Sequence, residues 1–381
     1  MKLFYNISSV HPWNDTRIYF RQAFSLGETG KYKVRHIAIK NNLIPDNIPE
    51  NIEVELLAKR SRKGRMLNWI ALYREIKKDK PDVIQFHDPE LLILMNIIRR
   101  IPRYQPVIVY DMHENVTKVL MRKKIPEIAL SMYRYLEKQL LRACSGVVFA
   151  EMTYKEDYRF LTCPTADVYN YPKIPLMKEN TEKEDVFTFI YLGSISDIRG
   201  GETMLLLAKR LVELKKVFHM KIIGTGSEAY IGKLKTFIFD NGLEDYISLE
   251  GEMAFDKAFE SIQKAHAGMA FLVPDPNFIG GKTTKCFEYM AAGIPFMVSD
   301  FLIQDVLDKW RCGVSVDVAN MDEIVQSAVY LMESPEEAGR MGELGQAAYG
   351  QEYNWENEEE KLRSLFDKLK SCSKEAYHGF I

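Results

Sequence analysis

The chain alternates short apolar runs with helical patterns, and this alternation is the feature that most limits its fold. In the first half, apolar runs typical of buried strands lie at 2–7, 34–39, 52–56, 83–86, 107–110, 147–150 and 167–169. Helical patterns lie between most of them, at 17–28, 66–78, 91–99 and 126–142. Strands that alternate with helices predict βαβ units, and therefore a parallel sheet with helices on both faces.

This alternation stops once and then restarts. The polar run 176–185, which follows the sequence YPKIP, has no apolar period and predicts a linker. Further strand candidates lie at 186–192, 220–223, 247–249, 268–273, 296–299 and 314–316. A final helical pattern at 355–370 places four apolar residues on one face: Leu362, Leu365, Phe366 and Leu369.

The predicted fold class is α/β, with two doubly wound, Rossmann-like domains. A chain of 381 residues exceeds what one hydrophobic core usually supports. The linker divides it into an N-terminal domain, 1–175, and a C-terminal domain, 176–353, which a C-terminal helix, 354–381, follows.

The N-terminus and the cysteines exclude several classes of protein. The first residues offer one lysine and a short apolar run that polar residues interrupt, which is unlike a signal peptide or a spanning helix. We therefore expect a cytoplasmic protein. The 5 cysteines are widely spaced and form no C-x-x-C pair, so neither a disulfide framework nor a zinc site is expected.

The two halves of the chain carry opposite charge. Residues 1–178 hold 30 Lys and Arg against 19 Asp and Glu, whereas the remainder holds 21 against 34. A basic half indicates an anionic partner, either a membrane surface or nucleic acid. Nucleic acid is disfavoured because the basic residues are not interleaved with an aromatic platform.

The segment TKCFEYMAAGIP, 284–295, has clear helix boundaries. Thr283 or Thr284 is the expected N-cap, 285–292 the helix, Gly293 its left-handed end and Pro295 the block to continuation. In an α/β sheet such a helix start presents unpaired N–H groups and a positive dipole end where ligands bind. Glu288 lies one turn into this helix.

This segment resembles the donor-binding signature of the retaining glycosyltransferases of the GT-B fold, family 4, also called group 1. The resemblance covers nearly the whole chain. It implies that the first domain binds the acceptor, that the second binds a nucleotide-diphosphate sugar across a central cleft, and that the last helix crosses back to the first domain. By resemblance Glu288 binds the ribose, although an ordinary amphipathic helix with Glu288 exposed remains an alternative.

In the second domain, the loop YLGSISDIRGG suits a diphosphate because N–H groups and one guanidinium converge at a strand end. The family usually has an Arg where Ser194 stands, and Arg199 takes the role of its Lys. Either Lys282 or Lys285 would replace the missing cation. A structural glycine-rich turn with an exposed Arg199 is the alternative.

Other donor residues follow from the resemblance. Gly280 stands where the family often has a Glu on the donor sugar, so backbone N–H groups of Gly280 and Gly281 or a neighbouring side chain would make those contacts. LEGEM, 249–253, would hold the base, with a plain loop as the alternative. The full predicted donor set is Gly193, Ser194, Arg199, Gly200, Gly224, Gly226, Gly251, Glu252, Gly280, Gly281, Lys282, Thr284 and Glu288.

In the first domain, polar clusters follow three strands. By resemblance, His113 contacts the donor sugar, and the predicted catalytic residues are His113, Asp111, Arg199 and Lys285. Asp111 and a further set shape the acceptor side: His11, Asn14, Asp15, His87 and Asp88. The run H-P-x-x-D-x-R-I, which ends with Arg17 and Ile18, resembles one subgroup of the family. Alternatively, Asp15 only caps the helix that begins near Thr16.

The resemblance implies glycosyl transfer with retention, by closure of two domains over the donor. The helix dipole, Arg199 and a lysine would stabilise the leaving diphosphate. No D-x-D motif is present, so no metal and no cofactor are expected. The expected acceptor is a glycan or a lipid-linked glycan, as in cell-surface polysaccharide synthesis. The alternatives are a nucleotide-sugar epimerase or phosphorylase of the same fold, and a non-catalytic binding protein.

Residues 118–144 join a basic cluster, Arg122, Lys123 and Lys124, to apolar residues, among them Ile125, Ile128, Leu130 and Met132. They predict an interfacial helix that docks the first domain on anionic lipid, on the inner face of the cell membrane. A second basic run, 59–65, fits the same face. A solvated surface helix is the alternative.

Overall fold

The computed structural model describes residues 1–42, 45, 48–61, 64–174, 181–276 and 278–378, with the side chains of the last helix described as far as Leu369. The chain forms two compact units. The first comprises Met1–Asn170 and Trp355–Ile381, and the second comprises Tyr171–Asn354. Residues 175–180, where the predicted domain boundary and the start of the linker fall, lie outside the described residues.

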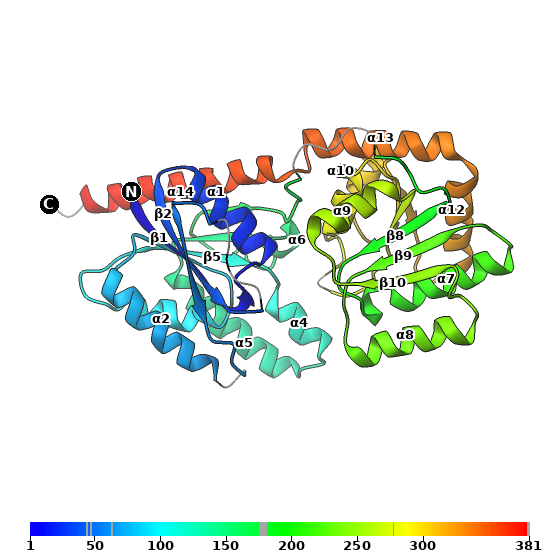
Figure 1. The fold of residues 1–381 in the computed structure, drawn as a ribbon. Helices are drawn as coiled ribbons and strands as arrows, with labels where there is room; N and C mark the ends of the chain where they lie inside the picture. Colours follow the sequence, from blue (N-terminus) through cyan, green and yellow to red (C-terminus); the bar gives the residue numbers. More distant parts are fainter. Residues whose placement is uncertain (43–44, 46–47, 62–63, 175–180, 277, 379–381) are drawn as a thin grey trace. The chain divides into compact units, whose positions relative to one another are not determined.

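The first unit is built on a parallel sheet of seven strands (Figure 1). Their order is β3-β2-β1-β4-β5-β6-β7. The strands are β1 (Lys2–Pro12), β2 (Tyr32–Ile39), β3 (Ile52–Leu57), β4 (Val83–Phe86), β5 (Val107–Met112), β6 (Gly146–Phe149) and β7 (Thr165–Asp167). The helices are the π-helix η1 (Thr16–Ala23), α1 (Phe24–Glu28), α2 (Arg65–Asp79), α3 (Leu91–Ile98), α4 (Val116–Arg122), α5 (Glu127–Leu140), the 3₁₀-helix η2 (Leu141–Ala143), α6 (Met152–Lys155) and α14 (Trp355–His378).

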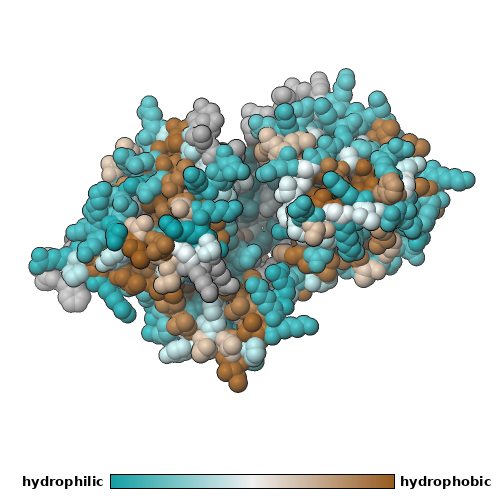
Figure 2. Space-filling model, turned by 60° about the horizontal axis from the view of Figure 1, so that its bottom comes forward, coloured by the Kyte–Doolittle hydropathy of each residue, from teal (hydrophilic) through white to brown (hydrophobic). Residues whose placement is uncertain are grey.

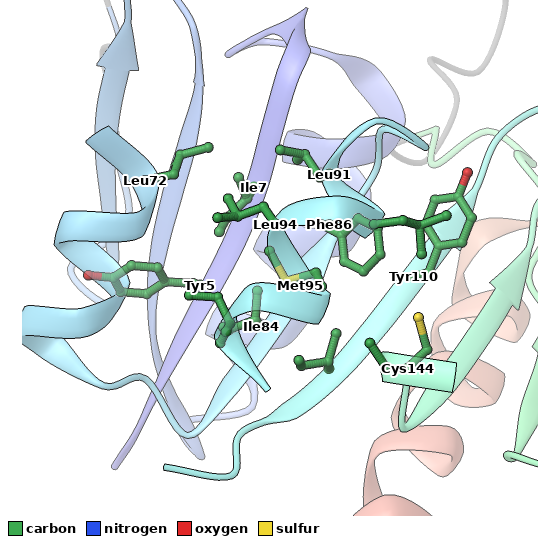
Figure 3. Packing of buried hydrophobic residues seen from close by; sticks show 14 of the residues in the cluster. Tyr5, Ile7, Leu72, Ile84, Phe86, Leu91, Leu94, Met95, Tyr110 and Cys144 are labelled. Atoms are coloured by element: carbon green, nitrogen blue, oxygen red, sulfur yellow. The ribbon is translucent and has the colours of Figure 1, made fainter. Parts of the chain in front are cut away.

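Alternate residues of each strand enter opposite cores of the first unit, because successive side chains of a strand point to opposite faces. Figure 3 shows one core, where Tyr5, Phe86 and Tyr110 pack with α2 and α3. The rings of Phe86 and Tyr110 stack with centroids 4.8 Å apart. The other core lies under η1, α1 and α14 and contains the four apolar residues expected on one face of the last helix: Leu362, Leu365, Phe366 and Leu369.

The second unit repeats this plan with a six-stranded parallel sheet in the order β10-β9-β8-β11-β12-β13. Its strands are β8 (Thr188–Leu192), β9 (His219–Ile223), β10 (Ile247–Gly251), β11 (Ala267–Ala270), β12 (Phe296–Ser299) and β13 (Val314–Val316). Its helices are the 3₁₀-helix η3 (Asp197–Arg199), α7 (Gly201–Glu213), α8 (Glu228–Asp240), α9 (Phe255–Lys264), α10 (Thr284–Ala291), α11 (Gln304–Trp310), α12 (Met321–Glu333) and α13 (Pro335–Gln351). Helices α7 and α8 cover one face of the sheet, and α9, α10 and α13 cover the other (Figure 1).

The prediction of one continuous helix within 118–144 is wrong, because this segment forms two helices. Helix α4 ends at Arg122 and α5 begins at Glu127, with Lys124 in the left-handed conformation (φ 53°) between them. Pro126 accounts for the break, because a proline disfavours helical backbone at the residue before it. Leu130 also faces the core, not the surface. In the second basic run, Arg62 and Lys63 lie outside the described residues.

Several predicted strand boundaries are also wrong, among them that of the strand placed at 268–273, which is β11 and ends at Ala270. Strand β1 continues past Ile7 to Pro12, because Pro12 pairs with Ile39 of β2 beyond an irregularity in the register. His11 therefore lies in the last part of a strand. Strand β7 covers Thr165–Asp167 and ends where the sequence pattern placed its start.

Among the described helices, none is both long enough and apolar enough to cross a bilayer.

Candidate functional site

The helix α10 has the boundaries that the sequence predicts. Thr283 is the N-cap, the helix runs from Thr284 to Ala291, and Gly293 takes a positive φ of 68°. The Thr283 side chain makes no capping hydrogen bond, so the first N–H groups of the helix have no side-chain acceptor from the cap. Glu288 lies one turn into the helix and is half-buried.

Three glycines lie side by side where neighbouring strands of the second unit end. The Gly193 N–H donates to Ile223 O (2.9 Å), and the Gly224 N–H donates to Gly251 O (2.7 Å). A Cβ atom at Gly224 would lie 1.8 Å from the carbonyl oxygen of Gly193, so no other residue fits there. The loops after β8, β9 and β10 thus form one closely packed group at the carboxyl ends of the strands, where α/β sheets bind ligands.

Lys285 points at this group of loops from α10. Only 7% of Lys285 is exposed, and its Nζ atom would be 2.8 Å from a Cβ atom at Gly193. The ammonium lies 5.0 Å from the ring centroid of Tyr191 and has no hydrogen-bonded or ion-paired anion among the described residues. A nearly buried cation without a bound anion is a ready partner for a phosphate group.

Burial, and then the positive charge of Arg199, lower the pKa of Lys285 to about 8, whereas the negative charge of Glu288 acts in the opposite direction. These three predicted site residues are therefore close enough to interact electrostatically. Arg199 lies in η3, directly before Gly200 and the start of α7. Gly200 is required there, because a Cβ atom would lie 2.0 Å from the carbonyl oxygen of Phe271.

Lys282, the other candidate for the missing cation, is already paired. Its Nζ atom lies 2.7 Å from Asp305 Oδ2. The backbone N–H groups expected for the donor sugar are also engaged: Gly280 donates to Phe301 O (2.9 Å) and Gly281 to Phe278 O (2.8 Å). The geometry therefore favours Lys285 over Lys282, and neither glycine N–H is available to a sugar in this conformation.

A cavity of about 640 Å³ opens in the second unit beside the glycine loops. It brings together Ser194 and Gly226 of the predicted donor set. Its other lining residues are Ile195, Ser196, Asp197, Glu202, Ser227, Tyr230 and Lys233. At the next strand end, Gly251 has a φ of 71° and Glu252 is exposed.

In the first unit, Asp111 is the centre of a buried polar cluster. Its Oδ2 atom lies 2.7 Å from His113 Nε2 and 2.9 Å from His87 Nδ1. Arg17 donates to both carboxylate oxygens, Nε to Oδ2 (3.0 Å) and Nη2 to Oδ1 (2.6 Å). Gln22 Nε2 also donates to Oδ2 (2.8 Å).

Charge and burial set the protonation states of Asp111 and His87 in this cluster. Burial alone would raise the pKa of Asp111, but the charges of Arg17 and His113 hold it well below its usual range. Burial lowers the pKa of His87 to about 4, against the opposing hydrogen bond to Asp111. At neutral pH the cluster therefore holds an ionised carboxylate and a neutral His87.

His11 lies next to this cluster, with its ring centroid 5.1 Å from that of His113. Its nitrogens face two carboxylates, Nδ1 to Asp15 Oδ2 (3.5 Å) and Nε2 to Asp88 Oδ1 (3.7 Å). Burial acts to lower the pKa of His11, yet the hydrogen bond to Asp15 and the charge of Asp88 raise it above the usual value. Burial in turn raises the pKa of Asp88.

Asp15 caps the helix η1, as the alternative interpretation of this residue expected. Its Oδ1 atom accepts hydrogen bonds from the N–H groups of Arg17 (2.9 Å) and Ile18 (3.0 Å) and so caps η1. The same carboxylate faces His11, so capping and a place in the cluster are compatible. Asn14 is held separately, because its Oδ1 atom accepts from Asn41 Nδ2 (2.7 Å).

Sequence reasoning missed Gln22 and Asn6 and gave Arg17 no role of its own. Asn6 Oδ1 lies 2.6 Å from His87 Nε2, from the middle of β1. Arg17 belongs to the H-P-x-x-D-x-R-I run, which was the one signal that pointed to it. Nothing in the local pattern shows that its partner is 94 residues away.

Two doubly wound parallel sheets on one chain have the architecture of the GT-B fold. Polar groups lie at the strand ends of each sheet, which is where such sheets bind ligands. Solved structures of GT-B glycosyltransferases match the chain over nearly its whole length. Sucrose-phosphate synthase from Thermosynechococcus elongatus has 13% identity and a TM-score of 0.77, and the match covers 98% of this chain and 100% of that chain. Alr3699/HepE from Anabaena, solved in complex with UDP and glucose, has 13% identity and a TM-score of 0.69, with 96% and 99% covered.

A third similar structure is WaaG, a glycosyltransferase involved in lipopolysaccharide biosynthesis, with 13% identity, a TM-score of 0.69 and 94% and 97% of the two chains covered. At these identities the likeness shows the fold. No curated protein matches the sequence of the chain. Residues 173–348 match the family model of the group 1 glycosyl transferases. The second unit is therefore a group 1 glycosyltransferase domain, on a chain with the GT-B fold.

Proposed function

We propose that this glycosyltransferase moves a sugar from a nucleotide-diphosphate sugar to a glycan or lipid-linked acceptor, with retention at the anomeric carbon. The observation that carries the proposal is the ammonium of Lys285, nearly buried against Gly193 and close to Arg199. Two cations and the start of α10 converge on one group of glycine loops. This is the arrangement that a diphosphate requires.

In the proposed reaction, the bond between the anomeric carbon and the diphosphate oxygen breaks as the acceptor oxygen bonds to the same carbon. The acceptor hydroxyl gives its proton to the departing diphosphate oxygen on the same face, so configuration is retained. Lys285, Arg199 and the N–H groups of α10 stabilise the charge that develops on the diphosphate. No metal is needed at the leaving group, because these groups supply the positive charge.

Related structures support the choice of substrate class. Alr3699/HepE was solved with UDP and with UDP-glucose. WaaG acts in lipopolysaccharide biosynthesis. We propose that the present chain likewise takes a nucleotide-sugar donor and acts in cell-surface polysaccharide synthesis, on the cytoplasmic side of the membrane.

The first test is a thermal-shift panel of UDP, GDP, ADP and CMP with their common sugars, in EDTA and then with Mg²⁺. A ligand at about 100 times its dissociation constant adds about 2.7 kcal/mol, which raises the midpoint by roughly 5–11 °C for a domain of this size. We expect one nucleoside diphosphate to raise the unfolding midpoint in EDTA. We expect the Lys285→Met substitution to abolish this rise. If no nucleotide shifts the wild-type protein, the donor site is refuted; if a shift requires Mg²⁺, the metal-free leaving-group model is refuted.

Retention is tested separately. The product formed from a donor of known anomeric configuration is analysed by NMR. The same configuration at the anomeric carbon supports the proposal, and the opposite one contradicts it.

A nucleotide-sugar epimerase is the second candidate, and one observation favours it. His11, His87 and His113 lie together with Asp88 and Asp111, and an epimerase requires such paired carboxylates and histidines over the sugar. The two reactions differ in their need for an acceptor. An epimerase converts the sugar of the free donor without any acceptor, whereas a transferase releases nucleoside diphosphate at a rate that depends on acceptor.

We also propose that α4 and α5 dock the first unit on an anionic lipid surface. Ile128, Met132 and Tyr135 recur at helical spacing on α5 and are 87%, 69% and 67% exposed. The exposed Arg122, Lys123 and Lys124 lie at the adjacent turn. Hydrophobic side chains reach the surface of the first unit in several places in Figure 2. Apolar insertion beside basic side chains is what an interfacial segment needs, with about 1 kcal/mol gained for each Lys or Arg.

Sedimentation with phosphatidylserine vesicles tests this surface. Charge reversal of Arg122, Lys123 and Lys124 to Glu should abolish binding, and so should Ile128→Ser combined with Met132→Ser. Lys235→Glu, on the exposed side of α8 in the second unit, is the control and should bind as the wild type does. If the wild type does not bind these vesicles, or if the two variants still bind, the membrane proposal fails.

A further inference from the structure

We propose that the first unit binds a divalent transition-metal ion, with Zn²⁺ as the best fit, through His87 Nδ1, His113 Nε2 and Asp111 Oδ2. These three atoms come from the ends of β4 and β5 and lie in one triangle. Its sides are 2.9 Å (His87 to Asp111), 2.7 Å (His113 to Asp111) and 3.2 Å (His87 to His113). This inference does not rest on the proposed transferase reaction.

The hydrogen bonds around His87 leave its Nδ1 atom as a lone-pair donor. Asn6 Nδ2 donates to the carbonyl oxygen of Ile18 (3.1 Å), which orients the Asn6 amide. Asn6 Oδ1, 2.6 Å from His87 Nε2, must then accept a hydrogen bond from that nitrogen. The Nδ1 atom of His87 is then an acceptor. His113 Nε2 lies 3.2 Å from it and 2.7 Å from Asp111 Oδ2, so the hydrogen on His113 Nε2 lies where a metal ion would replace it.

The size of the triangle suits a small ion. Zinc binds imidazole nitrogen and carboxylate oxygen at about 2.0–2.2 Å. A point at that distance from all three atoms lies just outside the plane of a triangle with sides of 2.7–3.2 Å. The sides are close to the edge of about 3.0 Å of an octahedral shell at this bond length, and a tetrahedral shell, with an edge of about 3.4 Å, requires the three side chains to move apart by a few tenths of an ångström.

The three proposed ligands are held by hydrogen bonds from neighbouring side chains, as metal ligands in proteins commonly are. Arg17 and Gln22 donate to the carboxylate of Asp111, and Asn6 holds the second nitrogen of His87. Such outer contacts fix ligand orientation, and their loss commonly costs 10–100-fold in metal affinity. Arg17 also spans both oxygens of Asp111, so the carboxylate keeps its orientation when Oδ2 binds an ion.

The cluster is partly open to solvent. His113 is 18% exposed and His11 33% exposed, whereas His87 and Asp111 are fully buried. His11 itself directs its two nitrogens at Asp15 and Asp88, so it is not counted as a ligand. Two imidazoles and one carboxylate favour zinc or iron over Mg²⁺ and Ca²⁺, which prefer oxygen ligands. An ion held on three protein ligands keeps a position for water or for a hydroxyl group.

The test is equilibrium dialysis of the full chain against Zn²⁺, with metal content measured by atomic emission. We expect about one ion per chain, and Co²⁺ at the same site should give the visible absorption of a nitrogen- and oxygen-bound ion. His113→Ala should lower the Zn²⁺ affinity at least 100-fold, and Gln22→Ala by about 10–100-fold. His113 is only partly buried, so that variant should fold, which circular dichroism checks.

His219→Ala in β9 of the second unit is the matched control, because it removes a partly buried histidine far along the chain from the cluster. It should bind Zn²⁺ as the wild type does. The proposal is overturned if the wild type binds no Zn²⁺ at micromolar concentration, or if a folded His113→Ala variant binds it as tightly as the wild type. A gain in melting temperature with Zn²⁺ that persists in His113→Ala would likewise assign the ion to another site.

Discussion

Arg17 and Asp111, 94 residues apart in the chain, form a two-pronged ion pair in the interior of the first unit. Their side chains are 5% and 0% exposed. The pair joins η1 to β5 beneath the cluster of histidines. It therefore serves two purposes, because it connects two elements of the fold and sets the orientation of the carboxylate that His87 and His113 contact.

Breaking this ion pair should destabilise the first unit. Arg17→Met leaves the carboxylate of Asp111 buried without its main counter-charge, which should cost about 3–5 kcal/mol in the free energy of unfolding measured in urea. Arg159→Ala is the control, since its ion pair with Glu156 is 76% exposed on both sides. That substitution should change stability by less than about 1 kcal/mol. Equal effects of the two substitutions would contradict the structural role of Arg17.

A side chain at Gly224 should disrupt the glycine loops. Gly224→Ala places a Cβ atom 1.8 Å from the carbonyl oxygen of Gly193, at a φ of 141° that other residues rarely adopt. We expect a loss of about 1–3 kcal/mol in stability, together with loss of nucleotide binding. Gly232→Ala in α8 meets no atom within 4 Å and should instead stabilise the helix by about 0.5–1 kcal/mol. Thermal unfolding and nucleotide titration of both variants measure these effects.

Glu288→Ala should weaken nucleotide binding and leave the fold intact, because Glu288 is only half-buried one turn into α10. Loss of hydrogen bonds from a carboxylate to ribose hydroxyls should cost about 1.5–3 kcal/mol, or roughly 10–150-fold in dissociation constant. Calorimetric titration with the nucleotide found in the thermal-shift panel measures it. Glu343→Ala, at an exposed position of α13, is the control. An unchanged affinity in Glu288→Ala would remove this residue from the ribose site.

Nucleotide binding should depend on pH through Lys285. Its folded pKa, about 8, lies below the usual lysine value, so Lys285 is mostly charged at neutral pH and loses its charge as the pH rises through about 8. A diphosphate binds the charged form, so affinity should be complete below pH 8 and should fall as the pH rises through about 8. The loss should approach 10-fold for each further pH unit. Lys285→Met should bind weakly and show no such fall, and a wild-type affinity that stays constant to about pH 9.5 would refute the assignment.

His113→Ala should reduce turnover more than donor affinity. His113 lies in the first unit, 2.7 Å from Asp111, while the proposed diphosphate groups belong to the second unit. We expect a fall of about 10²-fold in kcat, because His113 would hold the donor sugar in position and a small misplacement of the reacting groups costs about that much. The dissociation constant for the nucleotide should change by less than about threefold. Turnover equal to that of the wild type would place His113 outside the reaction.

Local sequence signals predicted much of the fold. The helix start at Thr283 or Thr284, the end at Gly293 and the strand 296–299 all appear as expected, because caps, glycine and proline act within a few residues. The same holds for the apolar face of α14 and for most strands of both sheets. The exceptions include the bounds of β1, β7 and β11 and the break before Pro126. The end of β1 depends on its pairing with β2, and the break depends on a single turn that the helical pattern concealed.

The sequence by itself determined which elements form, their parallel order and the polar residues at the strand ends, since periodicity and turn chemistry are local properties. The tertiary structure decided which of these residues meet. Only the packed sheets show that Lys285, not Lys282, faces Gly193, and that Arg17, Gln22 and two histidines converge on Asp111. Burial and long-range pairing set the charge states of these groups. Neither can be inferred from a short segment of the sequence.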